Sequence, residues 1–156
     1  MNNYVKFLSS FFICFLPAIL GGFFTKTGLT EWYDFLHKPV FNPPDWVFAP
    51  VWTILYFLMG ISLFLILKVP NSKAKNLAVT FFTLQLILNG LWSYVFFSLH
   101  SVLGAFFVII LLTTFLILSI LKFHPLNKAA AFIQLPYLLW ILFASILNYS
   151  IYILNK

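Results

Sequence analysis

Five long, uncharged and largely apolar segments alternate with short polar connections along this chain. They cover about Phe7–Thr25, Trp46–Leu67, Leu77–Phe97, Val102–Leu121 and Ala131–Leu154. A helix needs about 20 apolar residues to cross a hydrocarbon layer about 30 Å thick, and each segment has roughly that length. Because lipid offers no partner for open backbone groups, each segment is expected to be helical. The pattern therefore predicts an all-α membrane protein, a bundle of five transmembrane helices in a single domain of residues 1–156.

The stretch between Lys75 and Lys122 is the strongest part of this pattern. It contains no Asp, Glu, Lys or Arg and fits two membrane spans joined by a tight turn at Ser98–Ser101. A transmembrane β-barrel is the competing architecture, but its strands alternate apolar and polar residues over about 10 positions. Runs such as Val108–Leu112 do not alternate, so a helical bundle is favoured.

Three of the five predicted helices contain a proline. Pro17, Pro50 and Pro136 lie in the first, second and fifth segments, and each is expected to bend its helix by removing a hydrogen bond. Bent neighbours leave space that a straight bundle would fill. Proline is also common in membrane helices, so the bends alone do not establish a cavity.

The connection Lys26–Asp45 is the longest in the chain, and it is too aromatic and too rich in proline for a solvated tether. Its aromatic side chains and prolines are Trp32, Tyr33, His37, Pro39, Phe41, Pro43 and Pro44. We expect this first loop to fold back over the helix ends as a lid. Asn42 is expected to cap the next helix, with Pro43 or Pro44 in its first turn, where a missing N–H is tolerated.

The composition of the chain is typical of a protein that is surrounded by lipid. The chain is 63% hydrophobic and 8% charged, with a mean hydropathy of +1.03, and a soluble domain of this length could not hide so much apolar surface. The net charge of +6 comes from Lys without Arg, so the bidentate phosphate fork is missing and nucleic acid is not an expected partner. Cys14 is the single cysteine, which excludes an intrachain disulfide and leaves a zinc site without its usual thiols, so no metal is expected.

The lysines are divided unequally between the two ends of the predicted bundle. With five spans, the side of the N-terminus carries Lys6, Lys68, Lys73, Lys75, Lys122 and Lys128. The opposite side carries Lys26, Lys38 and Lys156, together with the three acids Glu31, Asp34 and Asp45. This bias predicts a multi-pass integral membrane protein with a cytoplasmic N-terminus, in contact with anionic lipid.

Polar and aromatic residues gather on one side of three predicted helices. The groups are Gln85, Asn89, Trp92, Ser93 and Phe96 in the third segment, Tyr137, Trp140, Ala144 and Asn148 in the fifth, and Ala49, Trp52, Tyr56 and Met59 in the second. Amides facing lipid would be costly, so these faces are expected to point inward. Two interpretations stay open. The amides join helices and the rings anchor the span ends, or the three faces enclose a flat, mostly apolar ligand.

The sequence offers no conventional catalytic constellation. His37, His100 and His124 all lie near predicted loops, and no predicted span contains a carboxylate. An acid–base pair in the core is therefore missing, and the same absence disfavours an ion-coupled transporter. Heme ligation by a histidine is conceivable at the rim only.

The residues discussed above belong to a set of sequence pieces that resembles the translocator protein family (TspO/MBR), also called tryptophan-rich sensory proteins or peripheral-type benzodiazepine receptors. In order, the pieces are Pro17–Phe23, Trp32–Tyr33, Leu36–Pro39, Asn42–Trp46, Ala49–Tyr56, Met59–Gly60, Gln85–Asn89, Trp92, Phe96–Phe97, Pro136–Trp140, Phe143–Ala144 and Leu147–Tyr149. Any one piece would be weak, but their consistent order and spacing over nearly the whole chain make the resemblance specific.

The resemblance implies a five-helix bundle, often a homodimer, whose pocket is closed by the first loop. It also implies that the protein binds or senses porphyrin-type tetrapyrroles, including heme, as ligands and not as a required cofactor. Translocation of these ligands is a further role that the resemblance implies. Sterols and benzodiazepine-type compounds are further ligands of the family. The residues similar to the family's pocket are Trp32, Tyr33, Pro43, Ala49, Trp52, Tyr56, Asn89, Trp92, Ser93, Phe96, Trp140 and Ala144.

Two alternatives come with the resemblance. Bacterial relatives are associated with light-dependent breakdown of protoporphyrin, and by that analogy Trp52 and Trp140 would be the redox-active pair of a photo-oxidising enzyme. The other alternative is a lipid or sterol transporter, to which the C-terminal pattern Leu147, Tyr152 and Lys156 adds a weak sterol-binding motif. The expected location is a bacterial cell membrane.

Overall fold

The five predicted spans are confirmed as helices. The computed structural model describes residues 2–28 and 32–156, with residues 25–28 as backbone alone. The elements are α1 (Asn3–Gly28), η1 (Tyr33–Phe35), α2 (Asp45–Lys68), α3 (Lys73–Ser93), η2 (Tyr94–Ser98), α4 (Val102–Phe123), α5 (Lys128–Ile133) and α6 (Leu135–Leu154). The part of the chain so described contains five helices long and apolar enough to cross a membrane, and no strand.

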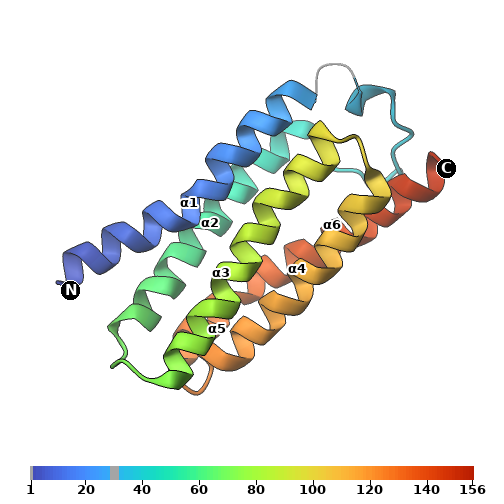
Figure 1. The fold of residues 1–156 in the computed structure, drawn as a ribbon. Coiled ribbons are helices and arrows are strands. Elements are labelled where there is room, and N and C mark those ends of the chain that lie inside the picture. The colour runs from blue at the N-terminus through green and yellow to red at the C-terminus, as the bar shows by residue number, and fades with distance from the viewer. Residues whose placement is uncertain (1, 29–31) are drawn as a thin grey trace.

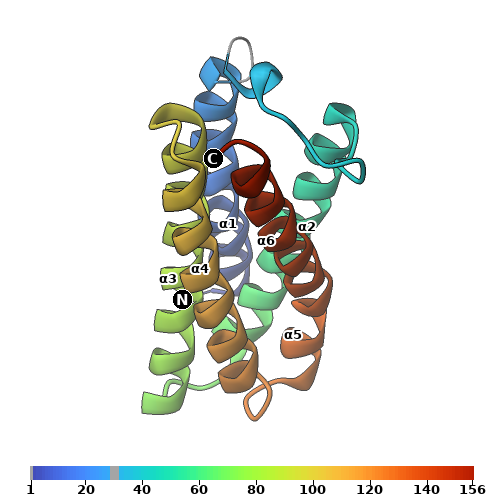
Figure 2. The same ribbon diagram turned by 90° about the vertical axis from the view of Figure 1, so that its right-hand side faces the viewer.

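The helices form an up-and-down bundle in which consecutive spans run antiparallel (Figure 1). The helix α1 packs against α2, α3 packs against α4, and α6 lies against α4. The described part of the first loop, residues 32–44, passes the C-terminal end of α6 and reaches the start of α2 (Figure 2). At the opposite end, the N-terminal part of α1 projects to one side of the bundle (Figure 1).

Short polar side chains start three of the helices. Ser72, Ser101 and Asn127 accept hydrogen bonds from backbone N–H groups three residues ahead, and so cap α3, α4 and α5. The tight turn predicted at Ser98–Ser101 is present, because η2 ends at Ser98 and α4 starts at Val102. Within this turn His100 has a φ of 52°.

The predicted cap at Asn42 is wrong. The helix α2 starts at Asp45 with Pro44 in the capping position, and Pro44 is extended at φ −57° and ψ 144°. A residue that precedes proline is driven out of the helical region, so Asn42 and Pro43 cannot enter the first turn. The Asn42 amide instead accepts a hydrogen bond from the Tyr33 hydroxyl at 3.4 Å and donates one to the Pro43 carbonyl at 3.1 Å.

The fifth span, Lys128–Leu154, is interrupted at Gln134, two residues before Pro136, and so divides into α5 and α6. Pro17 and Pro50 lie inside α1 and α2, but Pro136 lies in the first turn of α6, directly after the break at Gln134. Proline is tolerated in a first turn because the missing N–H has no helical partner there. Buried side chains bridge this break to α2, since Gln134 donates to the Ser62 hydroxyl at 3.2 Å, and Ser62 donates to the Ala130 carbonyl at 2.7 Å.

Candidate functional site

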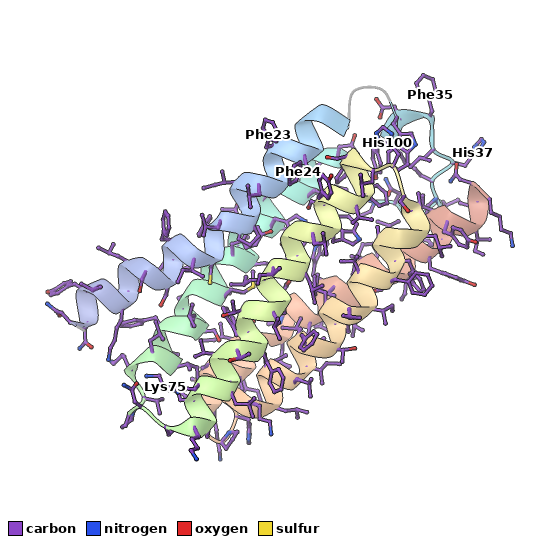
Figure 3. All side chains as sticks on the ribbon, in the orientation of Figure 1. Phe23, Phe24, Phe35, His37, Lys75 and His100 are labelled. Carbon is purple, nitrogen blue, oxygen red and sulfur yellow. The ribbon has the colours of Figure 1, made fainter. Side chains whose placement is uncertain are left out.

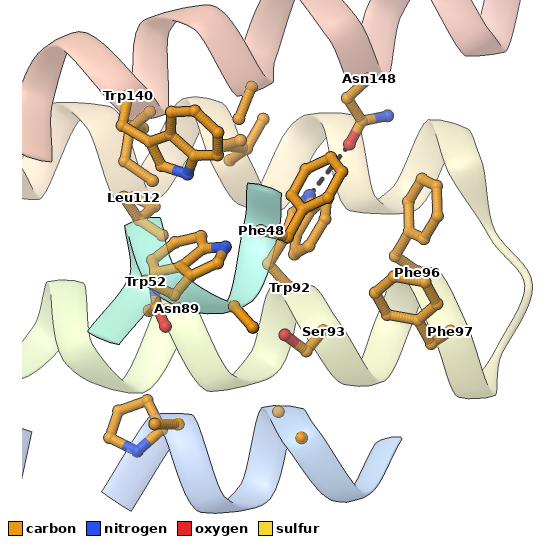
Figure 4. Close-up of a pocket in the computed structure, with 18 of the residues that line it drawn as sticks. Phe48, Trp52, Asn89, Trp92, Ser93, Phe96, Phe97, Leu112, Trp140 and Asn148 are labelled. Atoms are coloured by element: carbon orange, nitrogen blue, oxygen red, sulfur yellow. Dashed lines mark hydrogen bonds between the residues drawn. The ribbon is translucent and has the colours of Figure 1, made fainter. Parts of the chain in front are cut away.

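A cavity of about 530 Å³ lies in the half of the bundle nearest the first loop (Figure 4). Residues of all five spans and of η1 form its wall. These are Phe15, Pro17, Ala18, Gly21, Gly22, Tyr33, Asp45, Phe48, Ala49, Trp52, Thr53, Tyr56, Asn89, Trp92, Ser93, Phe96, Phe97, Ile109, Leu112, Trp140, Ile141, Ala144, Leu147, Asn148 and Ile151. The wall is largely apolar and aromatic, as is usual for sites that take small hydrophobic ligands.

The structure brings together most of the residues predicted for the pocket. Those on the cavity wall are Tyr33, Ala49, Trp52, Tyr56, Asn89, Trp92, Ser93, Phe96, Trp140 and Ala144, while Trp32 and Pro43 are not among the lining residues. Trp32 stacks on the His100 ring with the centroids 4.6 Å apart and meets Phe96 edge-on at 5.4 Å. Trp32 therefore lies outside the cavity and packs against the lining residue Phe96.

Three indoles line the cavity and are held by neighbouring rings. Trp52 stacks on Tyr56 at a centroid distance of 5.3 Å, and Trp92 stacks on Phe96 at 5.1 Å. Trp140 meets Phe48 edge-on at 6.0 Å. Trp52 from α2 and Trp140 from α6 approach the same space (Figure 4), so flat aromatic surface faces it from two helices.

The two amides on the wall are engaged in bonds between helices. Asn89 accepts a hydrogen bond from the Tyr56 hydroxyl at 2.6 Å and donates one to the Tyr137 hydroxyl at 3.0 Å, which joins α2, α3 and α6. Asn148 accepts from the Trp92 indole N–H at 2.9 Å and donates to the Val102 carbonyl at 2.8 Å. Of the two interpretations open from the sequence, the structure therefore shows interhelical bonding for these amides, and the same bonds fix the orientation of Trp92 and Tyr56.

Four polar groups on the wall have no hydrogen-bond partner among the described residues. They are the Ser93 hydroxyl on α3, the Asp45 carboxylate at the start of α2, and the indole N–H groups of Trp52 and Trp140. The Thr53 hydroxyl, by contrast, donates to the Ala49 carbonyl at 2.8 Å. A polar edge of a ligand would therefore meet Ser93, Asp45 or an unpaired indole N–H, and not the paired amides.

The contribution of α1 was not predicted beyond the kink at Pro17. Phe15, Pro17, Ala18, Gly21 and Gly22 form one wall of the cavity. A Cβ on Gly21 would lie 3.1 Å from the Ser93 hydroxyl oxygen, so glycine lets α1 approach α3 closely. The first segment has no amide or ring hydroxyl on this face, and its apolar residues look alike in the sequence whether they face lipid or the cavity.

The first loop closes one end of the cavity through Tyr33. Tyr33 is 5% exposed and lies on the cavity wall; burial raises the pKa of its phenol, which is therefore neutral. The Lys38 ammonium lies 3.8 Å from the centre of the Tyr33 ring. Asn155, just after α6, accepts from the His37 N–H and donates to the His37 carbonyl, both at 2.9 Å, so the loop is fastened to the C-terminal end of α6.

The predicted absence of a metal site remains a prediction, and the structure adds two observations. Within residues 2–28 and 32–156, no group of three His, Cys, Asp or Glu side chains could hold a metal ion. His37, His100 and His124 are not among the lining residues of the cavity. Of the C-terminal sterol-like pattern, Leu147 lies on the cavity wall, whereas Lys156 lies beyond the end of α6 and is exposed.

Comparisons with known proteins show the family of this chain. Residues 10–154 match the TspO/MBR family. The chain is 42% identical over 153 residues to the tryptophan-rich protein TspO of Archaeoglobus fulgidus, which covers 98% of this chain and 99% of that one. It is 34% identical to the tryptophan-rich sensory protein of Cereibacter sphaeroides, over 98% and 93% of the two chains. It is 30% identical to the human translocator protein, over 88% and 82%. The chain belongs to the TspO/MBR family of membrane proteins.

Proposed function

We propose that the cavity binds porphyrin-type tetrapyrroles and other flat hydrophobic molecules, and that this binding is the basis of a sensing or translocating role. The observation that carries the proposal is the arrangement of Trp52, Trp92 and Trp140 around one cavity. Aromatic rings offer a large, rigid contact surface that suits a planar ligand.

The size and lining of the cavity support a ligand of this kind. A volume of about 530 Å³ falls within the range of about 300–1,000 Å³ usual for small-molecule sites. The amides Asn89 and Asn148 are already paired, so most of the affinity would come from apolar and stacking contacts. We propose that the ligand's polar edge lies near Ser93, with the lid residue Tyr33 covering it.

The proposal is tested by titrating the detergent-solubilised protein with protoporphyrin IX and following the porphyrin absorption band. Saturable one-to-one binding is expected. The double variant Trp52→Phe plus Trp140→Phe keeps apolar rings but removes two indoles, and its dissociation constant should rise by roughly tenfold, since an aromatic pair contributes about 0.5–1.5 kcal/mol beyond its buried area.

Trp46→Phe is the matched control for this titration. Trp46 lies at the start of α2, is 75% exposed and is not among the lining residues of the cavity. Its variant should bind protoporphyrin as the unchanged protein does. Non-saturable binding, or equal affinity in the control and the double variant, would contradict the proposed site.

A second candidate function is photo-oxidation of the bound porphyrin, favoured by the stack of Trp52 on Tyr56. A photo-excited porphyrin can take an electron from the indole it contacts and pass it to dioxygen. The indole radical cation left behind then takes an electron from the porphyrin, so that the porphyrin is oxidised, dioxygen is reduced and the indole is restored; the stacked phenol ring extends the donor. The test is illumination of the complex in air. Porphyrin loss should be faster with protein than without it and should slow in Trp52→Phe; equal loss in all three samples would exclude this activity.

A further inference from the structure

A second pocket lies at the other end of the bundle, far from the aromatic cavity. It encloses about 640 Å³ between the N-terminal part of α1 and the turn from α2 to α3. Its lining residues are Lys6, Leu67, Lys68, Val69, Pro70, Asn71, Lys75, Asn76 and Val79. Three lysines therefore converge on one pocket.

Lys75 is a fixed positive charge within this pocket. Its side chain is 6% exposed, and its ammonium donates to the Leu67 carbonyl at 3.0 Å, the Val69 carbonyl at 2.7 Å and the Asn71 side-chain oxygen at 3.1 Å. It thus satisfies carbonyls at the C-terminal end of α2. Figure 3 shows Lys75 at the end of the bundle where α2 passes into α3. All three N–H groups are used, so Lys75 contributes charge and no free donor.

Lys6 and Lys68 are the free cations of the pocket. Lys6 is half-buried on α1, and Lys68 lies at the end of α2 with its ammonium 5.5 Å from the centre of the Phe64 ring. Neither ammonium makes a salt bridge or hydrogen bond within the described residues. Both can therefore donate to a ligand from outside the protein.

The described residues supply no carboxylate to this end. The acids of the chain are Glu31, Asp34 and Asp45. Asp34 and Asp45 lie at the opposite end, and Glu31 lies outside the described residues, in the connection that follows α1. Within residues 2–28 and 32–156, the three positive charges thus share a pocket without a carboxylate counter-ion, at the end of the bundle where α2 passes into α3.

We propose that this pocket binds the phosphate of an anionic lipid headgroup, with Lys6 and Lys68 as donors and Lys75 as the charge behind them. Basic pockets between helices at the membrane surface favour such headgroups. The apolar part of the wall, Leu67, Val69 and Val79, leaves room for the glycerol and upper acyl carbons. This site is independent of the proposed tetrapyrrole site.

The test is native mass spectrometry of the whole protein with added phosphatidylglycerol or phosphatidylcholine. The unchanged protein should retain phosphatidylglycerol preferentially. In the double variant Lys6→Gln plus Lys68→Gln this preference should fall by about fivefold for each lysine removed. Lys75 is left unchanged because it caps α2. Binding of protoporphyrin IX should be the same in the variant, which separates this site from the aromatic cavity.

The matched control is Lys122→Gln plus Lys128→Gln, which removes two exposed lysines from the same end but outside the pocket. The control should keep the preference for phosphatidylglycerol. An equal loss of the phosphatidylglycerol preference in both double variants would overturn the proposal. So would an unchanged protein that shows no such preference and is not stabilised by inorganic phosphate in the titration described next.

A third arm titrates inorganic phosphate into lipid-free protein and follows thermal unfolding. Stabilisation by phosphate that disappears in Lys6→Gln plus Lys68→Gln, without a lipid preference, would support the site and assign it to soluble phosphate. A preference for phosphatidylglycerol with no effect of millimolar phosphate would assign it to the lipid headgroup.

Discussion

The hydrogen bond from Tyr56 to Asn89 offers a sharp test of how the cavity is held together. The two side chains are 5% and 4% exposed, and the oxygen atoms lie 2.6 Å apart. Tyr56→Phe removes one hydroxyl, and Asn89→Leu removes the amide that also reaches Tyr137. Because both groups are buried, a single deletion leaves its partner unpaired in a place that water cannot reach easily.

The length and burial of this hydrogen bond set the expected loss in the free energy of unfolding. Interhelical hydrogen bonds in membrane proteins contribute about 0.6 kcal/mol on average and up to about 1.7 kcal/mol, and the short, buried bond here belongs at the upper end. We expect Tyr56→Phe to lower the free energy of unfolding by about 1–2 kcal/mol. Asn89→Leu breaks two bonds and should lower it by about 2–3 kcal/mol.

The assay is a double-mutant cycle measured by reversible unfolding in mixed micelles with helicity as the signal. Once Asn89 is leucine, the Tyr56 hydroxyl has lost its acceptor, so removing it should cost little more. We expect a coupling energy of about 1–1.5 kcal/mol. Fully additive effects would show that the bond does not join the helices, and this account of the cavity wall would be refuted.

Three further predictions follow from contacts elsewhere in the bundle. Asn155→Leu removes both bonds to the His37 backbone and should speed protoporphyrin association and dissociation in stopped-flow measurements; unchanged rates would show that the fastening does not control entry. Gly60→Ala places a Cβ 2.9 Å from the Phe11 ring and should lower the free energy of unfolding by about 1–3 kcal/mol, whereas wild-type stability would mean that Phe11 moves freely. Lys75→Met unpairs the carbonyls at the end of α2 and should lower the melting temperature, while an equal melting temperature would contradict the capping role.

The number of spans could be predicted from the sequence because the bilayer imposes a simple rule on apolar length. The rule does not extend to helix ends. A bend was predicted at Pro136, but the sequence did not place the break at Gln134 or show that this side chain bonds to Ser62 of α2, which is distant in the sequence. The start of the second span was predicted to within one residue, but its cap was misplaced at Asn42, because the effect of two successive prolines outweighs the capping preference of asparagine.

The cavity was predictable where a helix face carries polar or ring-hydroxyl groups, and not elsewhere. Tyr56 and Asn89 mark their faces because amides and hydroxyls avoid lipid. The wall from α1, including Gly21 and Gly22, carries no such mark. The partners of the amides depend on the relative rotation of the helices, which a helical period alone does not give, and so the sequence could not tell a bond between helices from a ligand contact.

The most direct test of the central proposal is an experimental structure of the complex with protoporphyrin IX in a lipid environment. The account predicts a macrocycle inside the cavity, in contact with the Trp52 and Trp140 indoles and covered by Tyr33. A porphyrin bound on the lipid-facing surface, with both indoles free of contact, would contradict it.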